Sequence, residues 1–166
     1  MNKKKTNIVL IGMPASGKST VGVILAKVLG MGFIDTDLVI QQKEDSLLYE
    51  IINDRGVDGF LVCEEEALLS INTVNTVIAT GGSAVYSERG MKHLSENGAI
   101  IYLKVEKDKL FDRLHEIRER GVVLRDGESL DEMYEERSVL YKKYADIIID
   151  EGDSSIEETV RRIIDR

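Results

Sequence analysis

The sequence contains very little cysteine and proline, and it contains no tryptophan. Its 166 residues include one cysteine, Cys63, one proline, Pro14, and no tryptophan. A single cysteine excludes an internal disulfide, and we expect Cys63 to be packed in the interior. No apolar run approaches the ~20 residues of a membrane-spanning helix, so we expect no membrane contact. Without repeats or a linker, the length predicts one domain over residues 1–166.

Positive charge is also scarce. Lysine and arginine number 22 against 30 aspartates and glutamates, for a formal net charge of -8. This balance disfavours nucleic-acid binding, which needs a basic face, but not nucleotide binding, which needs only local positive charge. The two histidines, His93 and His115, have no companion ligands at metal-binding spacing. After the basic start, the apolar stretch 8–11 is too short for a signal peptide, so we expect a cytoplasmic protein.

Apolar runs and helical spacing alternate along the chain. Five short runs predict buried parallel strands, at 7–11, 32–35, 76–80, 99–103 and 146–150. Helical spacing covers 18–29, 88–96, 107–117, 130–144 and 155–164, together with a pair, 47–53 and 60–71, broken at Gly56. The alternation predicts a three-layer α/β domain with a five-stranded parallel sheet, whose ligands bind at the carboxyl ends of the strands.

The most specific motif runs from Gly12 to Ser19 and matches G-x-x-x-x-G-K-[ST]. Glycines let backbone N–H groups turn inward around an anion, and the following helix points its N-terminus at the phosphates. Lys18 adds positive charge at the β and γ phosphates, and the Ser19 hydroxyl is the expected Mg²⁺ ligand. A plain glycine-rich turn is the alternative, but the flanking strand and helix favour a nucleoside triphosphate site.

Polar residues follow the second and third predicted strands. Asp35 and Asp37 lie two residues apart, so on an extended segment their side chains point the same way. One suits a metal ion and the other a reacting hydroxyl, although either is also able to cap the helix that follows. The turn 80–83 contains Gly81 and Gly82, which permit a close approach of backbone to ligand but also occur in plain tight turns. We expect the acidic run 64–66 to be a solvated face, with Glu64 as a partial exception because its helix would face the substrate.

In this order, the blocks 12–20, 33–37, 77–82, 136–141 and 144–150 resemble the shikimate kinase family, within the nucleoside monophosphate kinase superfamily. The similarity extends over nearly the whole chain. It implies a three-layer αβα P-loop fold with a lid at about 118–128. It also implies a monomer that uses ATP and Mg²⁺ to convert shikimate to shikimate 3-phosphate, in the shikimate pathway of aromatic amino acid biosynthesis.

The resemblance implies a role for each matching residue. Asp35 would share Mg²⁺ with Ser19, Asp37 would contact the shikimate hydroxyls, and Arg137 would pair with the shikimate carboxylate. The implied catalytic residues are Lys18, Asp37 and Arg120; the nucleotide-binding residues are Gly12, Met13, Ala15, Ser16, Gly17, Lys18, Ser19, Thr20 and Arg113; and the acceptor-binding residues are Asp37, Gly81, Gly82 and Arg137.

Two of the implied arginines have alternatives. Arg120 would reach over the phosphates from the lid, and Arg118 and Arg125 are rivals for that role. Arg137 would otherwise be a solvated helix arginine beside its acidic neighbours.

Three positions depart from the family pattern, and they lie in the acceptor and lid parts. Leu61 stands where the family has an arginine, which removes a charge-assisted contact worth on the order of 1.5–3 kcal/mol. Arg55 and Arg89 are candidates to replace that arginine. Ser83 stands where the family has a third glycine and needs more room than glycine.

The third departure is Gly121, which replaces a lid proline and predicts a looser lid. These changes leave open a kinase for another small hydroxy acid or polyol, such as a gluconate-like sugar acid. A second alternative is an ATP-binding module without catalysis.

Overall fold

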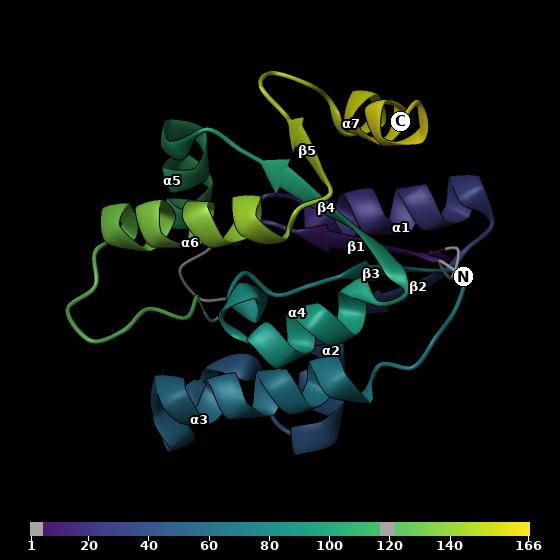
Figure 1. Ribbon diagram of the computed structural model, residues 1–166. Helices are drawn as coiled ribbons and strands as arrows, with labels where there is room; N and C mark the ends of the chain where they lie inside the picture. The colour runs from purple at the N-terminus through teal and green to yellow at the C-terminus, as the bar shows by residue number, and fades with distance from the viewer. Residues whose placement is uncertain (1–4, 117–121) are drawn as a thin grey trace.

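The protein is built around one parallel sheet. The computed structural model describes residues 5–116 and 122–166. Its strands lie in the order β2-β3-β1-β4-β5, and every neighbouring pair is parallel (Figure 1). They are β1 (Asn7–Ile11), β2 (Gly32–Asp35), β3 (Thr76–Ala79), β4 (Gly98–Lys104) and β5 (Ile147–Asp150). The predicted sheet is confirmed, and each strand end lies within one residue of its predicted position.

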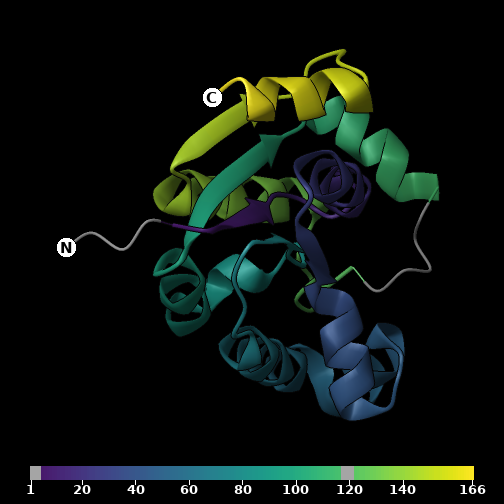
Figure 2. The same cartoon turned by 90° about the vertical axis from the view of Figure 1, so that its right-hand side faces the viewer.

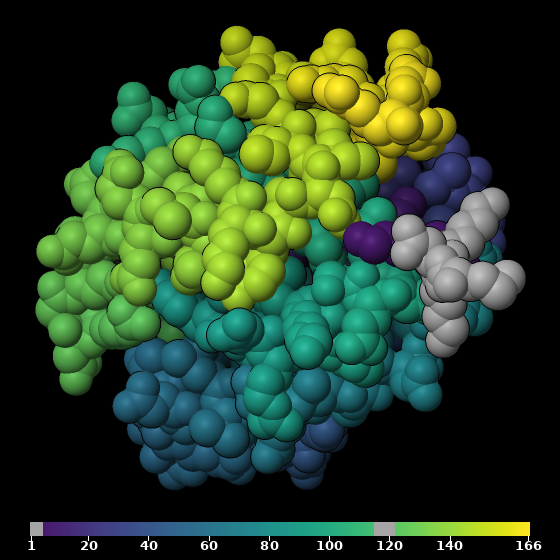
Figure 3. Space-filling view, in the orientation of Figure 1, coloured from purple at the N-terminus to yellow at the C-terminus, as the bar shows by residue number. Residues whose placement is uncertain are grey.

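Helices cover both faces of the sheet. Because successive strand residues point to opposite faces, Leu10 packs with α1 (Lys18–Leu29) and α7 (Ile156–Ile164), whereas Val9 faces the other layer. That layer contains α4 (Glu88–Ser95), α5 (Lys107–Glu116) and α6 (Leu130–Tyr144). Figures 1 and 2 show α4 and α6 across the sheet from α1. In the space-filling view, α6, α4 and α3 form one continuous face (Figure 3). Among the described residues, no helix combines the length and apolarity needed to cross a bilayer.

A pair of helices extends from one edge of this sandwich. They are α2 (Thr36–Glu44) and α3 (Leu48–Ser70), which pack around their own apolar cluster of Ile40, Ile51, Phe60, Cys63 and Ala67. Figure 2 shows the pair extending below the sheet. The predicted burial of Cys63 is confirmed.

The predicted break at Gly56 lies inside α3. At φ 70° and ψ 179°, Gly56 leaves the helical region, and the two halves of α3 meet there at a kink. The predicted pair of helices broken at Gly56 is therefore confirmed, and the two helical segments extend closer to the glycine than predicted. The helix expected after Asp35 is α2, whose range was not predicted from the helical spacing.

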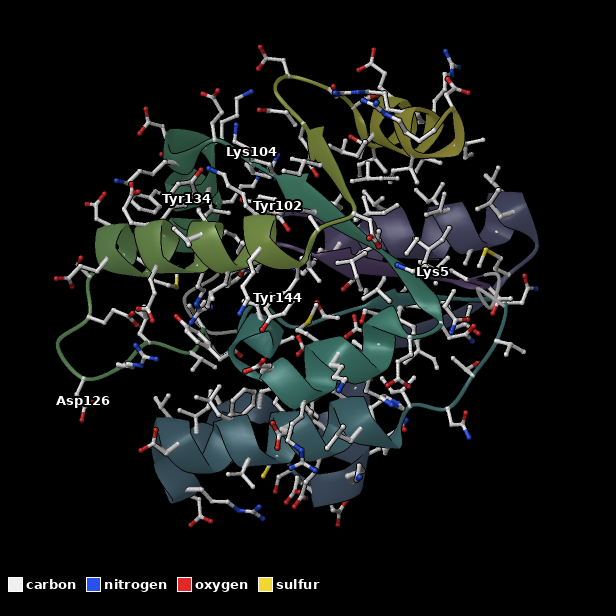
Figure 4. The ribbon with its side chains drawn as sticks, viewed as in Figure 1. Lys5, Tyr102, Lys104, Asp126, Tyr134 and Tyr144 are labelled. Atoms are coloured by element: carbon white, nitrogen blue, oxygen red, sulfur yellow. The ribbon has the colours of Figure 1, made fainter. Side chains whose placement is uncertain are left out.

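Aromatic contacts attach α6 to the sheet. The rings of Tyr102 on β4 and Tyr141 on α6 lie 5.0 Å apart. The Tyr134 hydroxyl donates to the carbonyl of Val105 just after β4, and Tyr102 and Tyr134 lie on the side of α6 that faces the sheet (Figure 4). The Tyr141 hydroxyl donates to the carbonyl of Gly82 at 2.5 Å. These contacts set the position of α6 relative to the turn after β3.

A truncation in the central strand tests the core. Leu10 is fully buried on β1, so Leu10→Ala should lower the free energy of unfolding by about 2–5 kcal/mol through lost burial and a residual cavity. Val23→Ala, on the exposed side of α1, should change it by no more than about 0.5 kcal/mol. Urea denaturation measures both, and a Leu10→Ala effect as small as that of Val23→Ala would contradict the assigned core.

Candidate functional site

The loop after β1 and the turn after β3 meet at the carboxyl edge of the sheet. The connections from these neighbouring strands leave toward opposite faces, because α1 lies on one face and α4 on the other. Such a point is where parallel sheets bind ligands. A cavity of about 340 Å³ opens there, within the range of small-molecule sites. Its lining includes Ala15, Gly17, Lys18, Ser19, Thr20, Asp37, Phe60, Gly81, Gly82, Ser83, Val123 and Arg137.

The loop 12–19 has the backbone geometry of an anion cradle. Gly12 has φ 149°, and a Cβ there would lie 2.7 Å from the carbonyl oxygen of Leu103, so no larger residue fits. Gly17 precedes α1 with φ 84°, and no side chain in the described structure caps this helix. The N–H groups at the start of α1 are therefore available to a phosphate.

Lys18 lies buried beneath this loop. Its ammonium donates to the carbonyls of Gly12 at 2.8 Å and Met13 at 2.6 Å. Burial lowers the pKa of Lys18 to about 8, although the carboxylates of Asp37 and Asp35 act in the opposite direction. The side chain therefore remains mostly cationic at neutral pH while it lines the cavity.

Asp35 serves two elements at once. One carboxylate oxygen accepts the backbone N–H of Asp37 at 3.0 Å and so caps the start of α2. The other accepts the hydroxyl of Ser19 at 2.6 Å. Of the two interpretations of Asp35, helix capping is confirmed, while the metal-holding role stays a prediction with which the contact to Ser19 agrees. Paired hard oxygen atoms next to a phosphate cradle fit Mg²⁺, which takes one or two protein ligands besides phosphates and water.

Asp37 and a second acid converge on the turn after β3. A Cβ built on Gly81 would lie 2.8 Å from Oδ1 of Asp37 and 2.7 Å from Oε1 of Glu64, so only glycine fits between these carboxyls. Burial and the nearby Asp35 raise the pKa of Asp37 to about 6. Burial likewise raises the pKa of Glu64 to about 7.

Arg137 enters the cavity from α6. Its side chain is 1% exposed, which rules out the alternative of a solvated helix arginine. Nη2 donates to the carbonyl of Val123, while Nε and Nη1 have no partner among the described residues. The guanidinium lies 5.4 Å from the ring centre of Tyr86. Unpaired buried donors of a cation are costly, and an anionic ligand would satisfy them.

Comparison with known proteins identifies the family that has this arrangement. A family model described as "Shikimate kinase" matches residues 14–166. The shikimate kinase of Methylococcus capsulatus is 33% identical over 165 residues, which cover 98% of this chain and 92% of that protein. The shikimate kinase of Histophilus somni is 34% identical over 166 residues, covering 98% and 95%. The chain belongs to the shikimate kinase family.

Solved structures agree with this assignment. The shikimate kinase of Acinetobacter baumannii in complex with shikimate superposes with a TM-score of 0.84 at 26% identity, over 96% of this chain and 90% of that one. The shikimate kinase of Bacteroides thetaiotaomicron gives 0.80 at 30% identity, over 96% and 97%. The predicted P-loop fold and the predicted family are confirmed.

The structure also locates the residues discussed for the family departures. Arg55 pairs with Glu44 at 2.6 Å and Arg89 with Glu65 at 2.9 Å, and neither arginine lines the cavity. The suggestion that one of them replaces the arginine missing at Leu61 is therefore not supported by this geometry.

The remaining predicted residues have distinct outcomes. Ser83 has φ -94°, an ordinary backbone conformation, so it replaces the family glycine without strain. Arg113 donates to the carbonyl of Ala15 and so lies beside the phosphate loop. Arg125 pairs with Glu136 on α6. Arg118, Arg120 and Gly121 lie outside the described residues.

Glu64 is the site residue that sequence reasoning underrated. It is 1% exposed, whereas its neighbours in the acidic run 64–66 are less buried. Phe60, Glu64, Ala67 and Leu68 recur at helical spacing, which would have indicated that this one acid shares the buried face.

Two substitutions at Asp35 test its role as a helix cap. Asparagine is as good a helix cap as aspartate, whereas alanine is not, so Asp35→Ala should be about 1 kcal/mol less stable than Asp35→Asn. Urea denaturation of the two variants measures this difference. Equal stabilities would show that the cap contributes nothing to folding.

The raised pKa values of Glu64 and Asp37 predict a dependence of stability on pH. Because the pKa of Glu64 is raised from 4.5 to about 7 on folding, the native state binds its proton more tightly than the unfolded state. The contribution of Glu64 is thus fully present below pH 4.5 and is lost as pH rises through about 7; the raised pKa of Asp37 acts in the same direction. Glu64→Gln should flatten this decline in chemical denaturation curves, and an unchanged slope would contradict the raised pKa.

Proposed function

We propose that the protein transfers the γ-phosphoryl group of ATP to a hydroxyl of shikimate, giving shikimate 3-phosphate and ADP. The observation that carries this proposal is one cavity that joins a phosphate cradle, a half-buried acid at Asp37 and a buried arginine at Arg137 with unpaired donors. The shikimate bound to the Acinetobacter baumannii relative supports the choice of acceptor.

On the donor side, the protein would place positive charge and backbone N–H groups against the phosphates of ATP. The loop amides and Lys18 would hold the β and γ phosphates, with Arg113 alongside the loop. We propose that Ser19 and Asp35 hold Mg²⁺, which would neutralise charge on the phosphates. The proximity of their oxygens, 2.6 Å, supports this pairing. Arg120 stays a predicted lid residue.

On the acceptor side, Asp37 would hold the reacting hydroxyl and take its proton. Its pKa near 6 suits a base that works close to neutral pH. Arg137 would bind the carboxylate through Nε and Nη1, the donors left free by Val123. Val123 also packs into the Phe60 cluster, and this apolar cover would keep water from competing with the acceptor.

A coupled ADP-release assay tests the activity. Shikimate at millimolar concentration should stimulate ADP release in the presence of Mg²⁺ and not in its absence. Gluconate and related hydroxy acids and polyols, tested in the same way, should stimulate less. Stimulation by one of them alone would replace shikimate as the acceptor, and ATP binding without stimulation by any member would favour a non-catalytic module.

Arg137 gives a sharper test of acceptor recognition. Arg137→Lys should raise the KM for shikimate about tenfold or more, because lysine cannot reproduce the guanidinium contacts, while the KM for ATP stays within about twofold. Arg89→Lys is the matched control, since Arg89 pairs with Glu65 outside the cavity. A rise in shikimate KM for Arg89→Lys but not for Arg137→Lys would contradict the assignment.

A further inference from the structure

Arg125 is one of the candidate lid arginines, but the structure gives its side chain other partners than a phosphate. Its Nη1 donates to both carboxylate oxygens of Glu136 on α6, at 3.0 and 3.2 Å. Its guanidinium also lies 5.0 Å from the ring centre of Tyr86, at the end of the short 3₁₀ helix Ala84–Tyr86. Arg125 does not line the 340 Å³ cavity, so its charge is paired within the wall of the site.

The backbone of Arg125 is held as well. Its N–H donates to the carboxylate of Glu128 at 3.0 Å, and its carbonyl accepts the N–H of Glu128 at 2.9 Å. These bonds close a turn over residues 125–128, in which Gly127 adopts φ 78°. Asp126 points outward from this turn (Figure 4). The turn therefore lies at the surface, and the side chain of Arg125 connects it to α6.

The residues before this turn form part of the cavity. Val122 and Val123 line it, and Val123 also packs into the apolar cluster of α2 and α3. The carbonyl of Val123 accepts Nη2 of Arg137. Residues 122–125, which we call the strap, therefore connect the α2–α3 pair with α6 and contact the arginine proposed to bind the acceptor.

Two contacts join the strap to α6 side by side. The carbonyl of Val123 binds Arg137, while Arg125, two residues further on, binds Glu136, the residue before Arg137. Val123 determines which donors of Arg137 remain free, because its carbonyl takes Nη2 and leaves Nε and Nη1 without a partner in the described structure. The position of the strap therefore sets the direction in which Arg137 presents those donors.

Tyr86 lies next to both arginines. Its ring centre is 5.0 Å from the guanidinium carbon of Arg125 and 5.4 Å from that of Arg137. A cation within about 6 Å of an aromatic ring is attracted by its π electrons, and the attraction is stronger where water is excluded, as it is around the buried Arg137. Glu136 offsets the charge of Arg125, so two cations are able to share one ring.

We propose that Arg125 and Tyr86 are positioning residues for Arg137, through which they set the affinity for the acceptor carboxylate. Arg125 holds the strap against α6 by its ion pair with Glu136, and the ring of Tyr86 restricts the guanidinium of Arg137. Both roles rest on the proposed function, in which Arg137 binds the carboxylate of shikimate. Arg125 then acts on acceptor binding and not on the phosphates of ATP.

Steady-state kinetics with shikimate and MgATP test these roles. Arg125→Gln and Tyr86→Leu should each raise the KM for shikimate about threefold to fivefold, the effect expected from a half-exposed ion pair and a cation–π contact. The KM for ATP and kcat should stay within about twofold. Tyr86→Phe keeps the ring and should retain the wild-type KM for shikimate.

A double variant shows whether the effect passes through Arg137. Arg137→Lys removes the guanidinium whose direction Arg125 sets, so adding Arg125→Gln to it should not raise the KM for shikimate further. An arginine that contacted the acceptor independently would instead multiply the two effects.

Lys107 provides a matched control, because it makes the same kinds of contact elsewhere along α6. Its ammonium pairs with Asp131 and lies 5.8 Å from the ring centre of Phe111 and 5.9 Å from that of Tyr134. None of these four residues lines the cavity. Lys107→Gln should therefore leave the KM for shikimate and the KM for ATP unchanged. Thermal denaturation would confirm that every variant is folded.

Several results would overturn the roles of Arg125 and Tyr86. They are an unchanged shikimate KM in folded Arg125→Gln or Tyr86→Leu, an equally large effect of Lys107→Gln, a Tyr86→Phe effect as large as that of Tyr86→Leu, or a further rise when Arg125→Gln is added to Arg137→Lys. A main effect of Arg125→Gln on kcat or on the KM for ATP would place Arg125 at the phosphates instead.

The wild-type protein separates the two levels of the proposal. If it phosphorylates shikimate, each of these results refutes only the positioning roles and leaves the proposed function standing. A wild-type protein that does not phosphorylate shikimate refutes the proposed function and the positioning roles together.

Discussion

The pairing of β1 with β3 is the contact on which the whole site depends. The carbonyl of Leu10 near the end of β1 accepts both the backbone N–H of Thr80, at 3.1 Å, and its hydroxyl, at 2.9 Å. These bonds place the end of β3 directly beside the start of the phosphate loop. A Cβ on Gly82 would lie 2.6 Å from the Pro14 ring, so the loop and the turn pack without space between them. Donor and acceptor sides of the cavity are therefore held at one fixed separation.

Around this junction the protein concentrates charge of both signs, in three buried side chains and the half-buried Asp37. Lys18 and Arg137 approach from α1 and α6, and Asp37 and Glu64 approach from α2 and α3. Burial of such a set rarely stabilises a fold, since the desolvation cost rivals the attraction between the charges. The arrangement is understandable as preorganisation, because groups already stripped of water need no rearrangement when a phosphate and a carboxylate arrive. The desolvation of these groups thus lowers the free energy of unfolding but prepares the cavity to bind charged ligands.

Features that depend on neighbouring residues could be predicted from the sequence, whereas features that depend on contacts between distant segments could not. Strands and the phosphate loop depend on local patterns, the apolar runs and the glycine spacing, and they were predicted to within one residue. Asp35 was placed correctly by its position after a strand, although no local rule could show that its two oxygens serve different partners. The contact of Glu64 with Ser83 joins residues 19 positions apart, and the contact of Arg137 with Val123 joins backbone to side chain across a loop. Such contacts depend on the relative orientation of whole helices, which the pattern of residue types does not encode.

Gly56 fixes the direction of the second half of α3 because glycine is the one residue type without a chiral Cα. Its φ of 70° with ψ of 179° belongs to a backbone region that is essentially closed to residues with a Cβ. The half of α3 after this point contains Phe60, Leu61 and Glu64, all of them at the acceptor side. The direction in which that half-helix approaches the sheet therefore depends on the achiral Gly56. Substitutions can change the side chains that this half-helix places at the acceptor side, as the leucine at position 61 shows. They cannot change its direction, because that direction depends on a backbone conformation at Gly56 that residues with a Cβ do not adopt.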